Sequence, residues 1–255
     1  VTDASPYLFQ FYNPLHRTAY QQSKDWATVN IYQWSAVTLL VALGASIIAS
    51  FLAILAPLIA SRGVDEGAGA SSGRPLRLRE FVYFSGLGLG FMALEIPIIQ
   101  ILSMYLGHPT YGFAVVLVAL LLASGLGSFI VDRLDPPPWV PCAVVAVFLA
   151  VVTAGVFPFL HATLDLPDPA RFAIGIGIVV VCGIPMGMPL ALGVRRLGRR
   201  SERSVAWAWG VNGAASVIGS CVVMIAMVFA GSHAALSLGA LSYVTAAMTA
   251  RTDWR

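Results

Sequence analysis

The sequence FVYFSGLGLGFMALEIPIIQILSM, residues 81–104, decides the fold class. Apart from Glu95, Gln100 and two serines, this stretch consists of apolar residues, glycine and one proline. A helix that crosses a bilayer needs about 20 consecutive, mostly apolar residues. The stretch therefore predicts a membrane-spanning helix, and the rest of the chain shows whether it is one of several.

The composition of the whole chain agrees with an integral membrane protein. Its 255 residues are 58% hydrophobic and 11% charged, whereas soluble domains carry about 25% charged residues. This balance argues against a soluble enzyme. The formal net charge of +3 is too small to indicate a nucleic-acid partner, so we expect none.

The chain predicts an all-α bundle of about seven transmembrane helices in residues 34–255. The predicted spans are Trp34 to Ala60, Phe81 to Met104, Tyr111 to Val131, Trp139 to Leu160, Phe172 to Val194, Val205 to Ala230 and His233 to Ala250. Residues 1–33 mix Tyr, Trp, Gln and a few charges, which suits an extracytoplasmic segment lying along the membrane interface or an ordinary linker. Because the chain begins with Val1 and opens on no signal-peptide pattern, we expect a piece of a longer protein or a processed chain.

The basic residues predict the orientation of these spans. If all seven cross, twelve basic residues fall on one side of the membrane and three on the other. The twelve are Arg62, Arg74, Arg77, Arg79, Arg133, Arg195, Arg196, Arg199, Arg200, Arg203, Arg251 and Arg255, and the three are Arg17, Lys24 and Arg171. Cytoplasmic loops carry the excess of Lys and Arg, so we expect a cytoplasmic C-terminus and an extracytoplasmic N-terminus. The loop RRLGRRSER can also hold anionic lipid headgroups, which makes membrane lipids expected partners.

Glu95 is the most unusual residue inside a predicted span. It comes about 14 residues into its helix, which is about 21 Å along a hydrocarbon core about 30 Å thick. Acidic residues at such depth face the bundle interior or a cavity, and Gly88, seven residues earlier on the same face, allows a neighbouring helix to approach. Thr153 and Ser220 lie at a similar depth and are the expected partners of a protonated Glu95. Three roles stay open: a structural link between helices, a proton or cation path, and a site for a polar ligand.

Two further features suggest helix contacts or a binding site. Asn212 lies in a row of small residues, Ala208, Ala215, Ser216 and Gly219, that favours tight helix packing and a hydrogen bond across the contact. Pro185 and Pro189 remove two backbone donors, which predicts a kink or break in that helix. Transporters place binding sites at such breaks.

We expect no metal, cofactor or catalytic site in this chain. The four histidines fall on four segments without metal-ligand spacing, and the three cysteines sit in apolar surroundings as packed thiols. The glycine runs are embedded in apolar spans, where they favour close helix packing over phosphate binding. The histidines are His16, His108, His161 and His233, and the cysteines are Cys142, Cys182 and Cys221.

Six motifs in order resemble the C-terminal membrane region of bacterial spermidine synthase-like proteins. They are VTDASPYLFQF, GLGLGFMALEIPIIQ, LGHPTYGFAVVL, LLASGLGS, MGMPLALGVRRL and AWAWGVNGAASVIGS. The resemblance implies a bacterial cytoplasmic membrane, and a domain similar to spermidine synthases and S-adenosylmethionine-dependent methyltransferases joined to the helices; some members are described as resembling major facilitator transporters. Thr2 and Asp3 match the tail of that soluble domain, whereas Ala4 replaces its second Asp. The positions that would hold a nucleoside or polyamine lie upstream, so no catalytic residue is carried over.

Three functions follow from these observations. The first is a non-catalytic membrane domain that anchors, scaffolds or joins a larger membrane protein or complex through partner subunits. The second is a small-molecule or proton-coupled transporter-like module, with Glu95 titrating and the Pro185 to Pro189 region forming the path. The third is the membrane half of an aminopropyltransferase or methyltransferase-like enzyme, whose activity would need an upstream domain.

Overall fold

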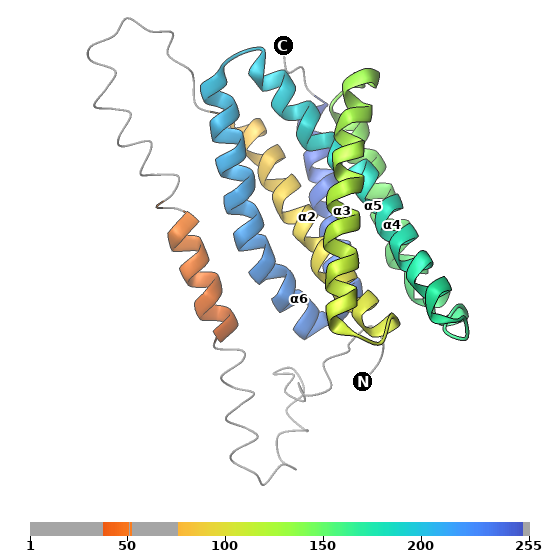
Figure 1. Ribbon diagram of the computed structural model, residues 1–255. Helices are drawn as coiled ribbons and strands as arrows, with labels where there is room; N and C mark the ends of the chain where they lie inside the picture. The colour runs from red at the N-terminus through yellow and green to blue at the C-terminus, as the bar shows by residue number, and fades with distance from the viewer. Residues whose placement is uncertain (1–37, 51, 53–75, 252–255) are drawn as a thin grey trace, which may run out of the picture.

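The computed structural model describes residues 38–50, 52 and 76–251 of the chain, and all regular structure in them is helical (Figure 1). A short helix covers Thr38–Ser50. The long helices are α2 (Leu78–Tyr105), α3 (Pro109–Leu134), α4 (Trp139–Ala162), α5 (Asp168–Gly198) and α6 (Glu202–Ala250). The predicted interfacial segment, residues 1–33, and about half of the first predicted span lie outside the described residues.

The all-α class is confirmed, but the number of helices differs from the prediction. Five described helices are long and apolar enough to cross a membrane, fewer than the seven predicted. Two of the predicted spans, Val205 to Ala230 and His233 to Ala250, form the single 49-residue element α6. In the first span the structure describes the 13-residue apolar helix Thr38–Ser50 and residue 52.

Gly231 divides α6 into two segments. Its φ of 82° and ψ of 175° are not helical, and such a conformation is accessible mainly to glycine. Beyond it the chain reverses, because Gly239 packs against Ala93 while Ser242 and Ala246 pack against Gly86, so this segment runs antiparallel to α2. In Figure 1, α6 accordingly begins and ends at the same end of the bundle. The predicted boundary between Ala230 and His233 is therefore a true turn.

Helix α2 is the centre of the bundle, because both segments of α6 pack on its glycines. A Cβ built on Gly88 would overlap the backbone of Asn212 and lie 2.9 Å from the Ser216 hydroxyl, and one on Gly86 would lie 3.0 Å from the Ser242 carbonyl. Small residues let membrane helices approach this closely. The prediction that Gly88 admits a neighbouring helix is confirmed, and that helix is α6.

The two ends of the bundle carry different side chains. Arg200 pairs with Glu80, and Arg251 lies over the Trp139 ring, which joins the ends of α5 and α6 to the starts of α2 and α4. At the opposite end, Arg171 lies over Tyr105, and Tyr105 shares a hydrogen bond with Thr163. Among the described residues, the first end holds nine arginines against four carboxylates, whereas the second holds one arginine and two aspartates. This gathering of arginines at one end is expected when successive helices of a membrane protein run in opposite directions.

Candidate functional site: a groove between α3 and α6

A groove of about 550 Å³ lies beside α2, between α3 and the first segment of α6. Helix α2 forms its floor, α5 and α3 form one wall, and α6 forms the other. Figure 1 shows α2 between α6 and α3. The lining residues are Leu87, Phe91, Met92, Leu121, Ser124, Gly125, Ser128, Met186, Gly187, Leu190, Ala191, Val194, Trp209, Asn212, Ser216 and Tyr243.

The groove exists because α3 packs against α5 and α2 and makes no extended contact with α6. At the α3–α5 crossing, a Cβ on Gly127 would overlap the Ile184 carbonyl, and one on Gly187 would overlap the Ser124 carbonyl. This close approach draws α3 onto α5 and away from α6. Gly125, two residues before Gly127, has no atom within 4 Å of its Cβ position and faces the open groove.

Asn212 takes part in both the contact between α6 and α2 and the lining of the groove. Its backbone carbonyl packs against Gly88 and accepts a 2.9 Å hydrogen bond from the Ser216 hydroxyl, so the small-residue row forms the predicted helix contact. Its side chain lines the groove and makes no hydrogen bond with another described residue. The predicted hydrogen bond across the contact is therefore replaced by an amide facing the groove.

Pro185 and Pro189 lie inside α5, which is a continuous helix of 31 residues. The helix is therefore not broken at these prolines, and the kink that the sequence also suggests stays a prediction. Both prolines are buried, and the Tyr83 hydroxyl of α2 donates a 2.7 Å hydrogen bond to the Pro189 carbonyl. This bond links α5 to α2, whereas the carbonyls that the two prolines leave without a helical donor are those of Val181 and Pro185.

Glu95 is half-buried on α2, one helical turn beyond the groove residue Phe91. The structure does not bring it to its expected partners. The Thr153 hydroxyl donates to the Leu149 carbonyl at 2.7 Å, and the Ser220 hydroxyl donates to the Val217 carbonyl at 2.8 Å, each within its own helix. Helix α4 packs mainly on α5 and α6, so Thr153 is not positioned against α2. Within the described part of the chain, Glu95 makes no hydrogen bond or ion pair.

The relative depth of Asn212 and Glu95 follows from the contact with Gly88. Gly88 precedes Glu95 by seven residues, which is about 10 Å along the helix axis. Asn212 packs beside Gly88, so it lies about 10 Å closer to the arginine-rich end than Glu95 does. The two polar residues are thus separate features of the bundle interior.

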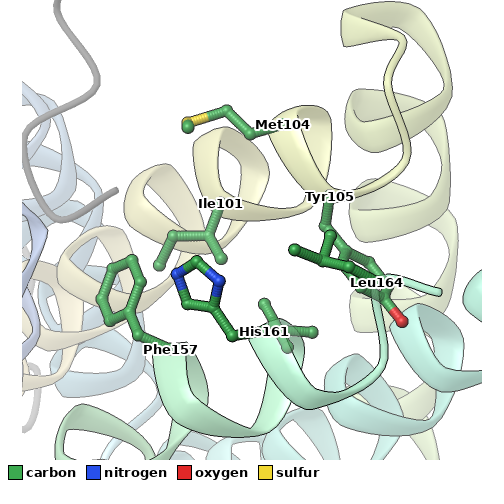
Figure 2. A pocket seen from close by; sticks show the side chains of 7 residues that line it. Ile101, Met104, Tyr105, Phe157, His161 and Leu164 are labelled. Carbon is green, nitrogen blue, oxygen red and sulfur yellow. The ribbon is translucent and has the colours of Figure 1, made fainter. Parts of the chain in front are cut away.

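Gln100 lies half-buried further along α2, and beyond it a smaller pocket of about 140 Å³ opens between the ends of α2 and α4 (Figure 2). Apolar residues line most of this pocket, with the His161 ring on one side. His233 stacks near Phe157 at 4.7 Å between ring centroids, and His108 packs edge-on against Tyr111. The three described histidines therefore lie at the arginine-poor end. No group of three or more metal-ligating side chains occurs in the described ranges.

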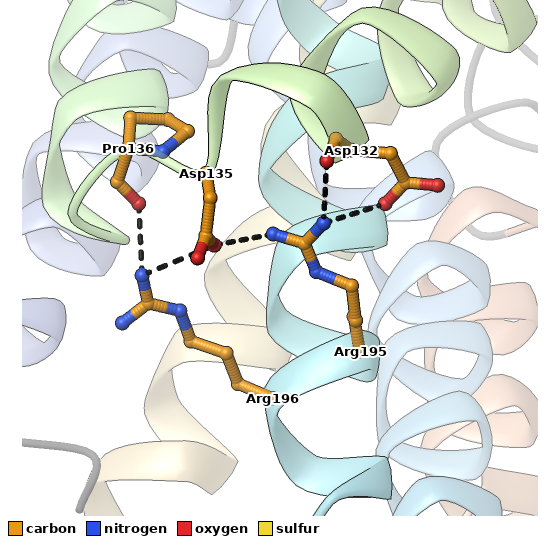
Figure 3. A network of polar contacts seen from close by, with 5 residues as sticks. All are labelled: Asp132, Asp135, Pro136, Arg195 and Arg196. Atoms are coloured by element: carbon orange, nitrogen blue, oxygen red, sulfur yellow. Dashed lines mark hydrogen bonds and ion pairs between the residues drawn. The ribbon is translucent and has the colours of Figure 1, made fainter.

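Ion pairs at the arginine-rich end join α5 to the loop between α3 and α4 (Figure 3). Arg195 pairs with Asp132 at 3.0 Å and with Asp135, while Arg196 donates a 2.9 Å hydrogen bond to the Pro136 carbonyl. Asp135 has a φ of 40°, and its carboxylate lies between the two arginines. This network fixes the ends of α3 and α5 to each other.

Comparisons with family models, curated proteins and solved structures found no match to this chain. The resemblance to spermidine synthase-like membrane regions stays a prediction, and the candidate site rests on the geometry alone.

No sequence motif points directly to the groove. The glycine run on α3 predicts close helix packing, and nothing in its pattern indicates that Ser124, Gly125, Ser128 and Trp209 share a site. Its two glycines differ: Gly127 contacts α5, whereas Gly125 faces open space. A usable signal was the pair Ser124 and Ser128, spaced one helical turn apart on an otherwise apolar helix.

Proposed function

We propose that the chain is a non-catalytic, multi-pass membrane domain that anchors or scaffolds a larger membrane assembly. The observation that supports this proposal is the large apolar surface left on α3 and α4. Leu122 and Leu121 on α3, and Val147 and Val151 on α4, are each more than 60% exposed. Apolar surface of this kind is covered by lipid or by another membrane helix.

The orientation and the number of crossings belong to the same proposal. We infer that the arginine-rich end faces the cytoplasm, because arginines are retained on that side. Gly231 makes α6 cross twice, and a full-length first span would bring the number of crossings to seven. The proposed setting is a bacterial cytoplasmic membrane with an extracytoplasmic N-terminus.

A photo-crosslinking amino acid tests the anchoring function. When the photo-crosslinking amino acid is placed at Leu122 or Val151 in native membranes, we expect it to capture a protein partner from at least one face. Both positions point out of the bundle. Placed at Leu120, which is 2% exposed, it should react only within the chain. The purified complex should also exceed the mass of a single chain by light scattering. Lipid adducts alone at both faces, with a monomeric mass, would contradict the proposal.

A second candidate is a small-molecule or proton-coupled transporter-like module. The observation that favours it is the groove, with Glu95 one turn beyond its Phe91 floor. Vesicles containing the chain and a pH gradient would be tested for uptake of radiolabelled spermidine, a probe that the resemblance suggests. If this function holds, Glu95→Gln should abolish the pH dependence of uptake, because the amide cannot exchange a proton.

The matched control for that experiment is Thr153→Val, which changes a polar residue that bonds only within its own helix. It should leave uptake and its pH dependence unchanged. Equal pH dependence in Glu95→Gln and the parent, or no uptake by the parent, would remove the transporter hypothesis.

A further inference from the structure

The groove stays open on the side where α3 and α6 separate. The helix Thr38–Ser50 does not fill it, because Ser46 lies 3.6 Å from the Cys221 sulfur of α6. Cys221 follows Asn212 by nine residues, which is about half a turn around the helix. The short helix is therefore on the opposite face of α6, and no other described segment lies over the groove.

The lining of the groove suits a flexible apolar chain. Its floor and α5 wall consist of residues such as Phe91, Met186 and Leu190. The serine hydroxyls already donate to carbonyls of their own helices, Ser124 to Leu121 at 3.1 Å and Ser128 to Gly125 at 2.7 Å. The Asn212 amide is left as a donor toward the groove. A ligand that matches this lining is mostly hydrocarbon with an acceptor, such as an ester carbonyl, near one end.

One end of the groove meets the arginine-rich end of the bundle. Val194 of the lining precedes Arg195 directly, and Ser128 lies one helical turn before Asp132. Arg195, Arg196 and Arg200 are engaged by carboxylates or by the Pro136 carbonyl. Arg199 is exposed and makes no ion pair with any described residue. With nine arginines against four carboxylates, this end attracts an anion.

We propose that the groove binds an acyl chain of an anionic phospholipid, with its phosphate held at the arginine-rich end of the bundle. The Asn212 amide is placed to donate to the ester region or the upper chain. This inference goes beyond the anchoring function and does not depend on it, because a bound lipid is compatible with either candidate function.

The test uses the full chain in lipid nanodiscs with a phosphatidylglycerol probe that carries a photoreactive diazirine in its acyl chain. Adducts should map to groove residues such as Leu190 and Phe91 in excess over exposed α4 residues such as Val147. Gly125→Leu places a side chain in the groove where no atom lies within 4 Å. It should lower groove crosslinking about tenfold, equivalent to about 1.4 kcal/mol of binding free energy.

The matched control is Gly155→Leu, on α4, where a Cβ also meets nothing within 4 Å and which contributes nothing to the groove. It should crosslink like the parent. If Gly125→Leu does not fold, Ser128→Leu fills the same groove from the next turn. Adducts spread evenly over the groove and α4 would overturn the proposal, because they would report ordinary surrounding lipid. Resistance of the parent groove to any adduct would also overturn it, since another part of the chain or a protein would then cover it.

The headgroup is tested by repeating the experiment with a phosphatidylcholine probe of the same chain. Groove adducts should favour phosphatidylglycerol in the parent, because the arginine-rich end attracts an anionic headgroup. Equal labelling by both probes in the parent would overturn the anionic part of the assignment.

Discussion

Gly127→Ala is expected to destabilise the protein by about 1–3 kcal/mol, the usual effect of forcing extra atoms into a packed contact. A Cβ at this position would overlap the Ile184 carbonyl of α5, and backbone atoms cannot move aside as a flexible side chain can. Helices α3 and α5 would have to separate, which would also disturb the contact of Gly187 with Ser124. Unfolding of the purified protein in mixed micelles by increasing denaturing detergent measures the change.

Gly125→Ala is the control for that measurement. It lies on the same helix two residues earlier, its Cβ position meets no atom within 4 Å, and alanine favours the helical conformation by about 1 kcal/mol relative to glycine. We expect its stability to equal or slightly exceed that of the parent. Equal stability of the Gly127 and Gly125 variants would show that the α3–α5 contact is looser than the structure indicates.

Arg200→Met is expected to lower the free energy of unfolding by about 1–3 kcal/mol, because it leaves the Glu80 carboxylate without its cation. The Arg200 and Glu80 side chains are 2.6 Å apart, and the Glu80 side chain is only 7% exposed. Glu80 also accepts a 2.8 Å hydrogen bond from the Arg77 backbone at the start of α2. Since Arg200 is 35% exposed, solvent screens the pair and keeps the effect below that of a fully buried one.

A double-mutant cycle with Glu80→Gln identifies the pair as the cause. Once Glu80 is neutral, Arg200→Met should cost much less, because no buried charge is left unpaired. Arg199→Met, at the neighbouring exposed arginine, should change stability by no more than about 0.5 kcal/mol. Identical effects of Arg200→Met in the parent and in Glu80→Gln would show that the two side chains are not coupled.

The sequence predicted the helical class and most helix positions because hydrocarbon length and apolar composition fix them almost independently of tertiary contacts. Helices α2 to α5 cover their predicted spans. Gly88 and the small-residue row around Asn212 each make the close helix contact that was predicted for them, although their pairing with each other was not predicted. The sorting of arginines to one end could likewise be seen from residue types alone.

What could not be predicted depends on which helices pack together. The depth of Glu95, Thr153 and Ser220 suggested a shared contact, yet depth says nothing about which helix is next to which. Pro185 and Pro189 suggested a kink or a break, yet α5 continues as one helix through both positions. The groove follows from the absence of an extended α3–α6 contact, a property of the assembled bundle that no single segment carries.

The reversal at Gly231 has a consequence for the order in which the protein is assembled during synthesis. Helix α2 emerges from the ribosome well before Ser242 and Ala246, the residues that cover its glycine face. Contacts so distant along the chain cannot form until the second segment of α6 has been synthesised. Until then, lipid alone covers this glycine face of α2.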